Sequence, residues 1–230
     1  MSRTATDKPP TKRQLAAEQT RQKLLDAALD NFSRRPYAEV TVGEIARSAG
    51  VAHGLLSHHF NGKENLYAEV VRKINGQLRA ATQITTEGSA EARVRRHLSA
   101  HFDFLAAHED AAVNLILRRA EATDIAWEAF EATRREGIRG ICALLNLDSE
   151  EPSLQLPMRG FVVVCDEMAL QWLRNGRSPS TGAMVDFCMA FLVGALEAAY
   201  GLTPTRALRA ALEELRRGRQ SRPEAPAAGR

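Results

Sequence analysis

The segment from 41 to 60, TVGEIARSAGVAHGLLSHHF, constrains the fold of this chain more than any other part of it. Thr41 and Glu44 have the spacing of a capping box, so a short helix is expected to begin directly after Thr41. Gly50 interrupts the apolar pattern and can adopt the positive φ that a tight turn requires. A second short apolar run, Val51–Phe60, follows. The segment therefore predicts two helices joined at a steep angle, a helix-turn-helix.

The side chains of this segment divide into a buried set and an outward set. Ala46 is small enough to let two helices cross closely. Ile45, Val51 and Leu56 are expected to form the small core that holds the pair together. The second helix would then present short or polar side chains, which suits entry into the major groove of DNA. The outward residues are Ala52, His53, Gly54, Leu55, Ser57, His58 and His59.

Helical patterns flank the segment on both sides. Thr11 and Gln14 resemble a capping box, so a first helix is expected to start there and to stop before Pro36. Its strongest apolar stripe is Leu25, Ala28, Leu29 and Phe32. A long helix begins near Lys63 and carries Leu66, Val70, Ile74 and Leu78 on one face. Four parts are expected: a flexible basic arm at 1–17, the DNA-binding unit at 18–78, a helical body at 84–202 and a basic, mobile tail at 203–230.

Charge supports this division of the chain. The formal net charge of +3 is distributed as +5 over residues 1–80, −6 over 81–202 and +4 over 203–230. A basic N-terminal part followed by an acidic body suits a polyanion-binding module joined to a sensing or dimerising unit. Few clusters of β-branched residues are present, so an all-α fold is expected. No apolar run of 18 residues and no apolar signal core are found, which favours a cytoplasmic location without a membrane partner.

Further helices are expected near 91–107, 110–121, 123–146, 152–176 and 180–200. The last two are apolar on more than one face, which suits helices buried against both their own body and a partner chain. The three cysteines, Cys142, Cys165 and Cys188, lack metal-ligand spacing. They are interpreted as reduced core residues, with a redox sensor as the alternative, and no cofactor or metal site is expected.

Three runs carry a resemblance to a known family: LLDAALDNF, TVGEIARSAGV and GLLSHHFNGKENLYAEVV. On these runs, which lie within about residues 18–78, the chain resembles the TetR (tetracycline-repressor) family of bacterial regulators. The resemblance implies an N-terminal helix-turn-helix domain and a C-terminal helical domain for ligand binding and dimerisation. GLLSHHF is similar to the recognition helix of the choline-responsive repressor of betaine synthesis. Most members of the family instead carry threonine at Leu55 and tyrosine at Ser57.

The resemblance also implies roles for individual residues. Thr41 would cap the first motif helix, and it or its neighbours Val42 and Gly43 would lie against a phosphate. His59 and Lys63 match phosphate-contacting positions of the family. Each of these residues also has a purely structural reading, as a helix cap, a packed ring or a solvated surface group. The candidates for base contacts are Ala52, His53, Gly54, Leu55, Ser57 and His58.

A homodimer built on the helices near 152–176 and 180–200 would place two recognition helices on a palindromic operator, and an unknown small-molecule effector would enter the C-terminal body. The candidate cavity walls are Phe102, Leu105, Leu115, Trp127, Phe130, Met168 and Phe187, with Asp103, Glu121 or Asp166 as polar contacts.

The function that follows is a ligand-released repressor. An activator or an effector-independent DNA-binding protein of the same fold remains the alternative. No HExxH, GxGxxG, GxSxG or P-loop pattern is present, so an enzyme is not expected.

Overall fold

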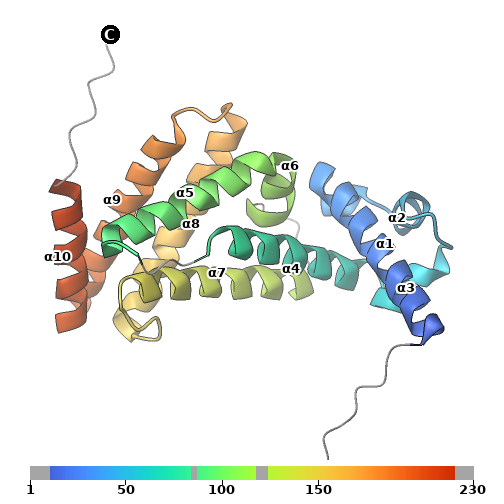
Figure 1. Cartoon of the computed structure of the whole chain (residues 1–230), viewed down its shortest axis with the longest axis horizontal. Helices are drawn as coiled ribbons and strands as arrows, with labels where there is room; N and C mark the ends of the chain where they lie inside the picture. Colours follow the sequence, from blue (N-terminus) through green and yellow to red (C-terminus); the bar gives the residue numbers. More distant parts are fainter. Residues whose placement is uncertain (1–10, 84–86, 118–123, 221–230) are drawn as a thin grey trace, which may run out of the picture.

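The computed structural model describes residues 11–83, 87–117 and 124–220. Every regular element in these ranges is helical, so the predicted all-α fold is confirmed. Figure 1 shows an elongated molecule with α1, α2 and α3 gathered at one end and a larger helical body at the other. The elements are α1 (Lys12–Arg34), η1 (Tyr37–Glu39), α2 (Val42–Ser48), α3 (Gly54–Phe60), α4 (Lys63–Ala81), α5 (Ala90–Ala107), α6 (Glu109–Ala111), η2 (Ala112–Leu117), α7 (Asp124–Leu144), α8 (Pro152–Arg174), α9 (Thr181–Leu202) and α10 (Arg206–Gln220).

The first helix, α1, starts where its capping residues predict. The Gln14 amide donates to the Thr11 hydroxyl over 3.3 Å, and the Thr11 amide donates to the Gln14 side chain over 2.8 Å. The helix ends at Arg34, before Pro36. Residues 12–17 are therefore helical, which corrects the expectation that the flexible arm extends to 17. The rest of that arm, 1–10, lies outside the described residues.

The long helix α4 connects the two ends of the molecule. It packs against α1 and α3 near its start and against α7 and α5 further along. Leu66, Val70, Ile74 and Leu78 are buried on it, as their spacing predicts. The buried side chains of α4 belong to one continuous hydrophobic core that extends from the N-terminal helices into the body, so α4 joins the two parts without an intervening linker.

The body is a bundle in which α8 packs along α9, and α5 and α7 complete the core. Observed bounds agree with the predicted helices near 91–107, 152–176 and 180–200 to within two residues. The segment expected as one helix at 110–121 is instead α6 followed by the π-helix η2, and residues 118–123 lie outside the description.

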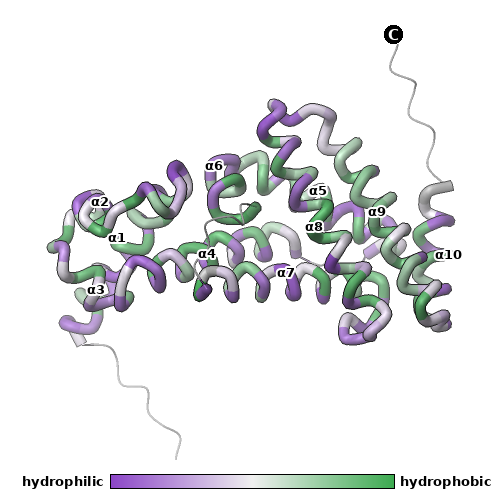
Figure 2. Tube along the Cα trace, turned by 180° about the vertical axis from the view of Figure 1, so that it is seen from behind, coloured by the Kyte–Doolittle hydropathy of each residue, from purple (hydrophilic) through white to green (hydrophobic). Residues whose placement is uncertain are grey.

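The segment after 203 corrects a second expectation. Over Arg206–Gln220 the structure has the helix α10 instead of a mobile tail, and this helix packs against α5 and α9, while the rest of the expected tail, 221–230, lies outside the described residues. Its buried residues are Leu208, Ala211, Leu212 and Leu215, a helical stripe whose other face is basic. Figure 2 shows this alternation of hydrophobic and hydrophilic residues along α10. The Ala90 amide at the start of α5 donates to the Glu214 carboxylate over 2.7 Å, which ties α10 to the body.

The helix α9 is the most apolar of the described helices long enough to compare with a membrane span. Its length and composition alone would allow it to cross a membrane, but the buried core helix of a soluble protein meets the same criteria. Asp186 on α9 pairs with Arg95 over 2.6 Å and Glu197 pairs with Arg216 over 2.7 Å. These ion pairs join the polar face of α9 to α5 and α10, so the helix is an integral part of the bundle.

Candidate functional site

The predicted helix-turn-helix is formed by α2 and α3. Gly50 has φ +64°, the left-handed conformation that the turn requires. The Val51 amide donates to the Ala46 carbonyl over 3.0 Å and closes the turn. Ala46, Ile45 and Leu56 are buried at the crossing of the two helices, as predicted.

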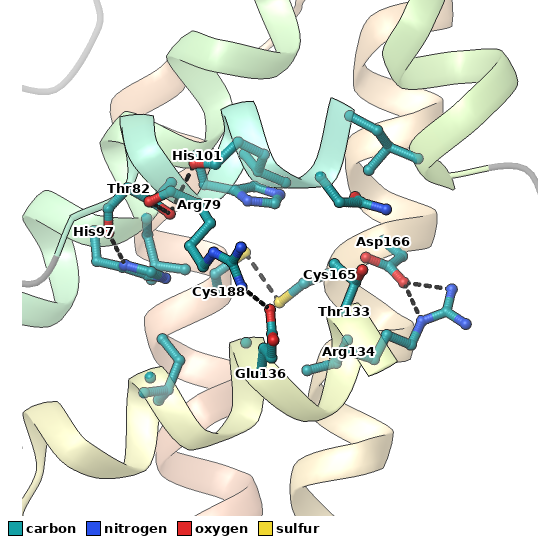
Figure 3. A pocket seen from close by; sticks show the side chains of 18 of the residues that line it. Arg79, Thr82, His97, His101, Thr133, Arg134, Glu136, Cys165, Asp166 and Cys188 are labelled. Atoms are coloured by element: carbon teal, nitrogen blue, oxygen red, sulfur yellow. Dashed lines mark hydrogen bonds and ion pairs between the residues drawn. The ribbon is translucent and has the colours of Figure 1, made fainter. Parts of the chain in front are cut away.

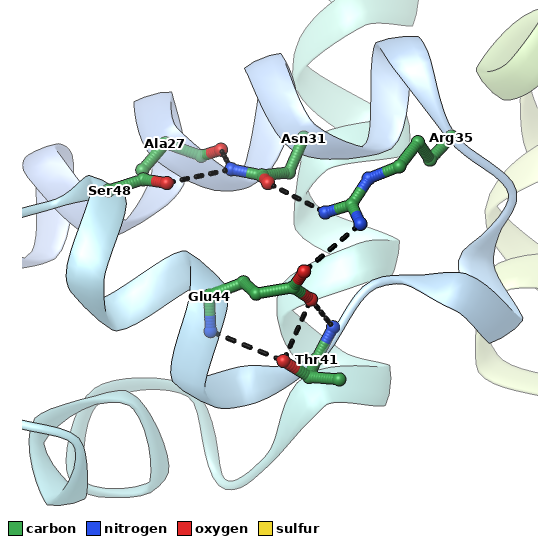
Figure 4. A network of polar contacts seen from close by, with 6 residues as sticks. All are labelled: Ala27, Asn31, Arg35, Thr41, Glu44 and Ser48. Atoms are coloured by element: carbon green, nitrogen blue, oxygen red, sulfur yellow. Dashed lines mark hydrogen bonds and ion pairs between the residues drawn. The ribbon is translucent and has the colours of Figure 1, made fainter.

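A polar network holds α2 against α1, as Figure 4 shows. Thr41 and Glu44 form both hydrogen bonds of a capping box. Arg35 on the α1 side donates to Glu44 over 3.1 Å and to Asn31 over 3.1 Å. Asn31 in turn donates to Ser48, the last residue of α2, over 3.3 Å. The hydrogen bonds from Thr41, followed by that from Arg35, lower the pKa of Glu44 to about 2. Both ends of α2 are thereby fixed to α1.

Most residues that the sequence predicted to face outward on α3 and just before it are exposed in the structure. Leu56 and Phe60 are buried, so the opposite face of this short helix is turned away from the core. His53 precedes the helix, and a Cβ placed on Gly43 would lie 3.7 Å from its Nδ1, so the imidazole lies over the second residue of α2. Ala52, His53, Gly54, Ser57 and His58 are exposed, whereas Leu55 and His59 are partly buried.

Lys63 lies at the first position of α4 and is partly buried. Its Nζ is 4.0 Å from the centroid of the Tyr37 ring, a cation–π arrangement. Burial lowers the pKa of Lys63, while the charge of Glu44 acts in the opposite direction. The Tyr37 ring also contacts that of Tyr67, with centroids 4.8 Å apart. The Tyr37 ring thus holds the ammonium group at the start of α4, a contact that the sequence did not indicate.

A cavity of about 410 Å³ lies in the body, between α4, α5, α7, α8 and α9. Figure 3 shows side chains from these helices directed into it. The walls are mainly apolar, and Phe102, Phe130 and Phe161 contribute aromatic rings. A cavity of this size and lining is typical of sites for small organic ligands.

The predicted cavity residues fall into two groups. Phe102, Phe130 and Asp166 line the cavity. The other five predicted wall residues do not: Leu105 and Leu115 are fully buried in the core, Met168 is partly buried, and Trp127 and Phe187 are exposed. The position of Phe187 shows why the prediction failed. Successive residues of a helix point about 100° apart, so Cys188 faces the cavity and its neighbour Phe187 does not. Asp103 is exposed and Glu121 lies outside the described residues.

The charged groups of the cavity lining are paired with one another. Arg134 donates to one oxygen of Asp166 from two nitrogens, over 3.0 and 2.8 Å. Arg79 donates to Glu136 over 2.7 Å. Two arginines and two carboxylates therefore balance around the cavity, and Figure 3 shows both pairs.

The other polar lining residues include two histidines and one asparagine, beside Thr82, Gln83 and Thr133. His97 Nδ1 is 3.0 Å from the Thr82 carbonyl oxygen. Burial lowers the pKa of His101 to about 4, with a smaller effect from His97, and burial likewise lowers the pKa of His97. Asn75 is 6% exposed, and neither its amide nitrogen nor its oxygen has a hydrogen-bond partner among the described residues.

Sequence reasoning missed Asn75, although the signal was present. Val71, Asn75 and Leu78 have i, i+4, i+7 spacing, so the asparagine interrupts a face that is otherwise buried on α4. A buried amide without a partner is rare in folded proteins and calls for an explanation.

The three cysteines are free. Cys165 on α8 and Cys188 on α9 both line the cavity, with their sulfur atoms 3.2 Å apart. The hydrogen bond to Cys188, together with burial, raises the pKa of Cys165, and burial raises that of Cys142 to about 11. Cys142 and Cys165 are therefore protonated near neutral pH, and the absence of a disulfide among the three agrees with their interpretation as reduced core residues.

An N-terminal helix-turn-helix continuous with a helical body that contains a cavity defines the class of two-domain helix-turn-helix proteins. Residues 24–70 match the family model described as bacterial regulatory proteins, tetR family. Over these residues the N-terminal unit is similar to the TetR family, in agreement with the three sequence runs that carry the resemblance.

Relatives and solved structures agree with this assignment. The HTH-type transcriptional regulator BetI of Escherichia coli is 36% identical over 87 residues, which cover 36% of this chain and 45% of that protein. The chain thus matches somewhat less than half the length of these curated relatives. A tetR-family transcriptional regulator from Streptomyces coelicolor superimposes with a TM-score of 0.72 at 26% identity, over 91% of this chain and 92% of that one. FadR from Bacillus subtilis, solved with stearoyl-CoA, has a TM-score of 0.61 at 20% identity, over 76% and 98%, and shares the fold.

Proposed function

We propose that this chain is a transcriptional repressor that binds a palindromic DNA operator as a homodimer and dissociates when a small molecule enters the cavity. One observation carries the proposal: the residues around the start of α3 are exposed at one end of the molecule, on a helix whose opposite face is buried. Such a helix can enter a major groove with its N-terminal residues against the base edges. BetI, the relative matched over this region, is named as a transcriptional regulator.

Base and backbone contacts are assigned to different residues in this proposal. His53, Gly54, Leu55, Ser57 and His58, with Ala52, face the base edges, where Leu55 and Ala52 can contact thymine methyl groups and Ser57 can hydrogen-bond. Thr41, Val42, Gly43, His59 and Lys63 contact phosphates. The position of Lys63 supports this role, because the Tyr37 ring holds its ammonium group at the end of α4 next to α3.

The proposed dimer forms through α8 and α9. Large hydrophobic side chains on α9 are exposed in the single chain: Phe187 is 48% and Phe191 is 46% exposed. Together with small residues they form one helical stripe, which a second copy of the chain would cover. The stripe consists of Phe187, Ala190, Phe191, Gly194, Ala198 and Leu202.

Effector response is proposed to pass through α4. This helix lines the cavity with Asn75 and Leu78 and also packs against α1 and α3. The solved FadR structure is in complex with stearoyl-CoA, so a protein of this fold accommodates a ligand. A ligand that binds better to one position of α4 shifts the population toward it, and a coupling of about 1–3 kcal/mol changes DNA affinity about 5- to 150-fold.

In vitro selection from random double-stranded DNA tests the DNA-binding part. The full chain is expected to enrich an inverted repeat whose half-site centres lie about one helical turn apart, roughly 34–36 Å. Lys63→Ala should weaken binding to all selected sequences and reduce the salt slope by about 1, whereas Ser57→Ala should mainly change sequence preference. Lys73→Ala is the matched control, because Lys73 lies on the same helix and pairs with Asp26 over 2.5 Å. Failure to enrich any sequence, or equal salt slopes for the two lysine variants, would refute the docking.

Light scattering tests the dimer. Phe191→Asp is expected to convert the protein to a monomer at micromolar concentration. Leu15→Asp, at a residue of α1 that is 48% exposed, should leave the dimer intact. A monomeric unmodified protein would contradict the proposed interface.

A further inference from the structure

The unpaired amide of Asn75 indicates what the cavity binds. Its side chain lines the cavity and is buried, while its nitrogen and its oxygen both lack hydrogen-bond partners among the described residues. A buried polar group is costly when it is not hydrogen-bonded, so a fold retains one chiefly where something else completes it. An amide offers both a donor and an acceptor, and a ligand that pairs with it fully must supply one of each.

Among the described residues that line the cavity, no charged side chain is left unpaired for a charged ligand. Arg134 pairs with Asp166 and also with Glu131, over 3.3 Å. Arg79 pairs with Glu136 across the gap between α4 and α7. A cationic ligand would have to compete with an arginine for each of the two lining carboxylates, and an anionic ligand would have to displace a carboxylate.

The two histidines are also uncharged. Since the Thr82 carbonyl can only accept, neutral His97 donates through Nδ1 and keeps Nε2 as an acceptor. Burial keeps His101 neutral well below pH 7. The polar groups that the described residues contribute to the lining are therefore neutral or belong to compensated ion pairs, while the other described walls are apolar and aromatic.

We propose that the cavity binds an uncharged, largely apolar molecule with a single head group that both donates and accepts hydrogen bonds, as a primary carboxamide does, and that Asn75 pairs with this head group. The inference rests on the proposed function for the ligand's role as effector. It adds the chemical class of the ligand and the residue of α4 that recognises it. Because Asn75 belongs to the helix that packs against α3, the head group acts directly on the element that the DNA-binding unit shares with the body.

A quaternary ammonium compound is the competing ligand class. The resemblance of the Gly54–Phe60 run to a choline-responsive repressor suggests it, and three phenylalanine rings in the wall could attract a cation through their faces. The paired carboxylates and the unpaired amide favour the neutral class instead. A direct comparison of the two classes therefore decides the matter.

Isothermal titration calorimetry on the full chain, without DNA, provides the test. The probes are octanamide, 2-nonanone and octyltrimethylammonium, which share an alkyl chain and differ in head group. The ketone 2-nonanone can only accept hydrogen bonds, whereas octanamide also donates them. Octanamide is therefore expected to make one more hydrogen bond with Asn75 and to bind about tenfold more tightly. Octyltrimethylammonium is expected to bind more weakly than octanamide.

Variants on α4 locate the head group. Asn75→Leu should remove the preference for octanamide over 2-nonanone. Asn65→Leu is the matched control, because Asn65 lies on the same helix outside the cavity, and it should retain the preference. Asn75→Asp adds an uncompensated carboxylate and should shift preference toward octyltrimethylammonium, a gain that a misfolded variant could not show.

Three results would overturn the inference: tighter binding of octyltrimethylammonium than of octanamide, an undiminished octanamide preference in Asn75→Leu, or no binding of octanamide up to its solubility limit. Selected DNA distinguishes these failures from failure of the proposed function. If the chain binds its selected repeat but not octanamide, the ligand class is wrong and the DNA-binding function stands. If octanamide binds through Asn75 but no DNA is selected, the proposed DNA-binding function is wrong and the ligand class stands.

Discussion

Replacing Gly50 by alanine should destabilise the helix-turn-helix by an amount that the backbone alone determines. Gly50 has φ +64°, and no heavy atom counted among the described residues lies within 4 Å of the position that a Cβ would take. The added methyl group therefore meets no neighbour, and the cost is that of holding alanine in the left-handed conformation. This cost is about 1–2 kcal/mol in the free energy of unfolding.

Gly76→Ala is the matched control. The chemical change is the same, and a Cβ at Gly76 also has no heavy atom of the described chain within 4 Å, but Gly76 lies inside α4. Alanine is favoured over glycine in a helix interior by about 0.5–1 kcal/mol, so this variant should be more stable than the unmodified protein. The two substitutions should thus change stability in opposite directions.

Urea unfolding of the full chain, followed by circular dichroism, measures both variants, and unchanged m-values would show that only stability has changed. Gly50→Asn should fall between glycine and alanine, because asparagine tolerates the left-handed region. The reasoning would be refuted if Gly50→Ala were as stable as the unmodified protein, or if both alanine variants shifted the midpoint in the same direction.

Three further substitutions test other parts of the structure. His101 has a pKa of about 4 in the folded chain, below the ordinary 6.5, because of burial and then His97; the unfolded chain therefore binds the proton first, and stability is lost as pH falls from 6.5 toward 4. Urea unfolding at pH 7 and at pH 4.5 measures this loss in the free energy of unfolding, and His101→Gln should reduce it by up to about 3 kcal/mol. An equal pH response of both proteins would contradict a neutral buried ring. A Cβ at Gly218 would lie 2.6 Å from Cβ of Glu91, so Gly218→Ala should cost about 1–3 kcal/mol in the same assay, whereas no change would mean that α10 is not packed on α5. Thr41→Val removes the hydroxyl cap of α2 and should cost about 1 kcal/mol; a thermal midpoint that does not fall would argue against the capping box.

The helix-turn-helix could be predicted because its determinants are local in sequence. Thr41 and Glu44 form their capping box within one turn, and Gly50 alone can take the turn conformation without strain. The family resemblance then added residue roles that spacing could not provide. Lys63 was identified in this way, but its contact with Tyr37 depends on tertiary packing and was not visible in the sequence.

The cavity was less predictable because apolar periodicity identifies a buried face without showing whether an atom or a void lies opposite it. Leu105 and Phe102 are three residues apart on α5 and both are buried, yet only Phe102 borders the cavity. The helix α10 was missed for a different reason. Its stripe from Leu208 to Leu215 is regular, but its basic face suggested a solvated tail, and the surface that it covers is supplied by α5 and α9.

The geometry of α4 sets the scale on which the two ends of the molecule communicate. Asn75 is twelve residues from Lys63, which corresponds to about 18 Å along a straight helix. A tilt of about 5° pivoting at Asn75 would swing the first turn of α4 sideways by roughly 1.5 Å, given this lever arm. In a symmetric dimer the two α4 helices would tilt in opposite directions. The distance between the two recognition helices would then change by about 3 Å, compared with the roughly 34 Å repeat of the double helix. In the dimer proposed above, such a small angular adjustment would move the two recognition helices away from the spacing of consecutive major grooves.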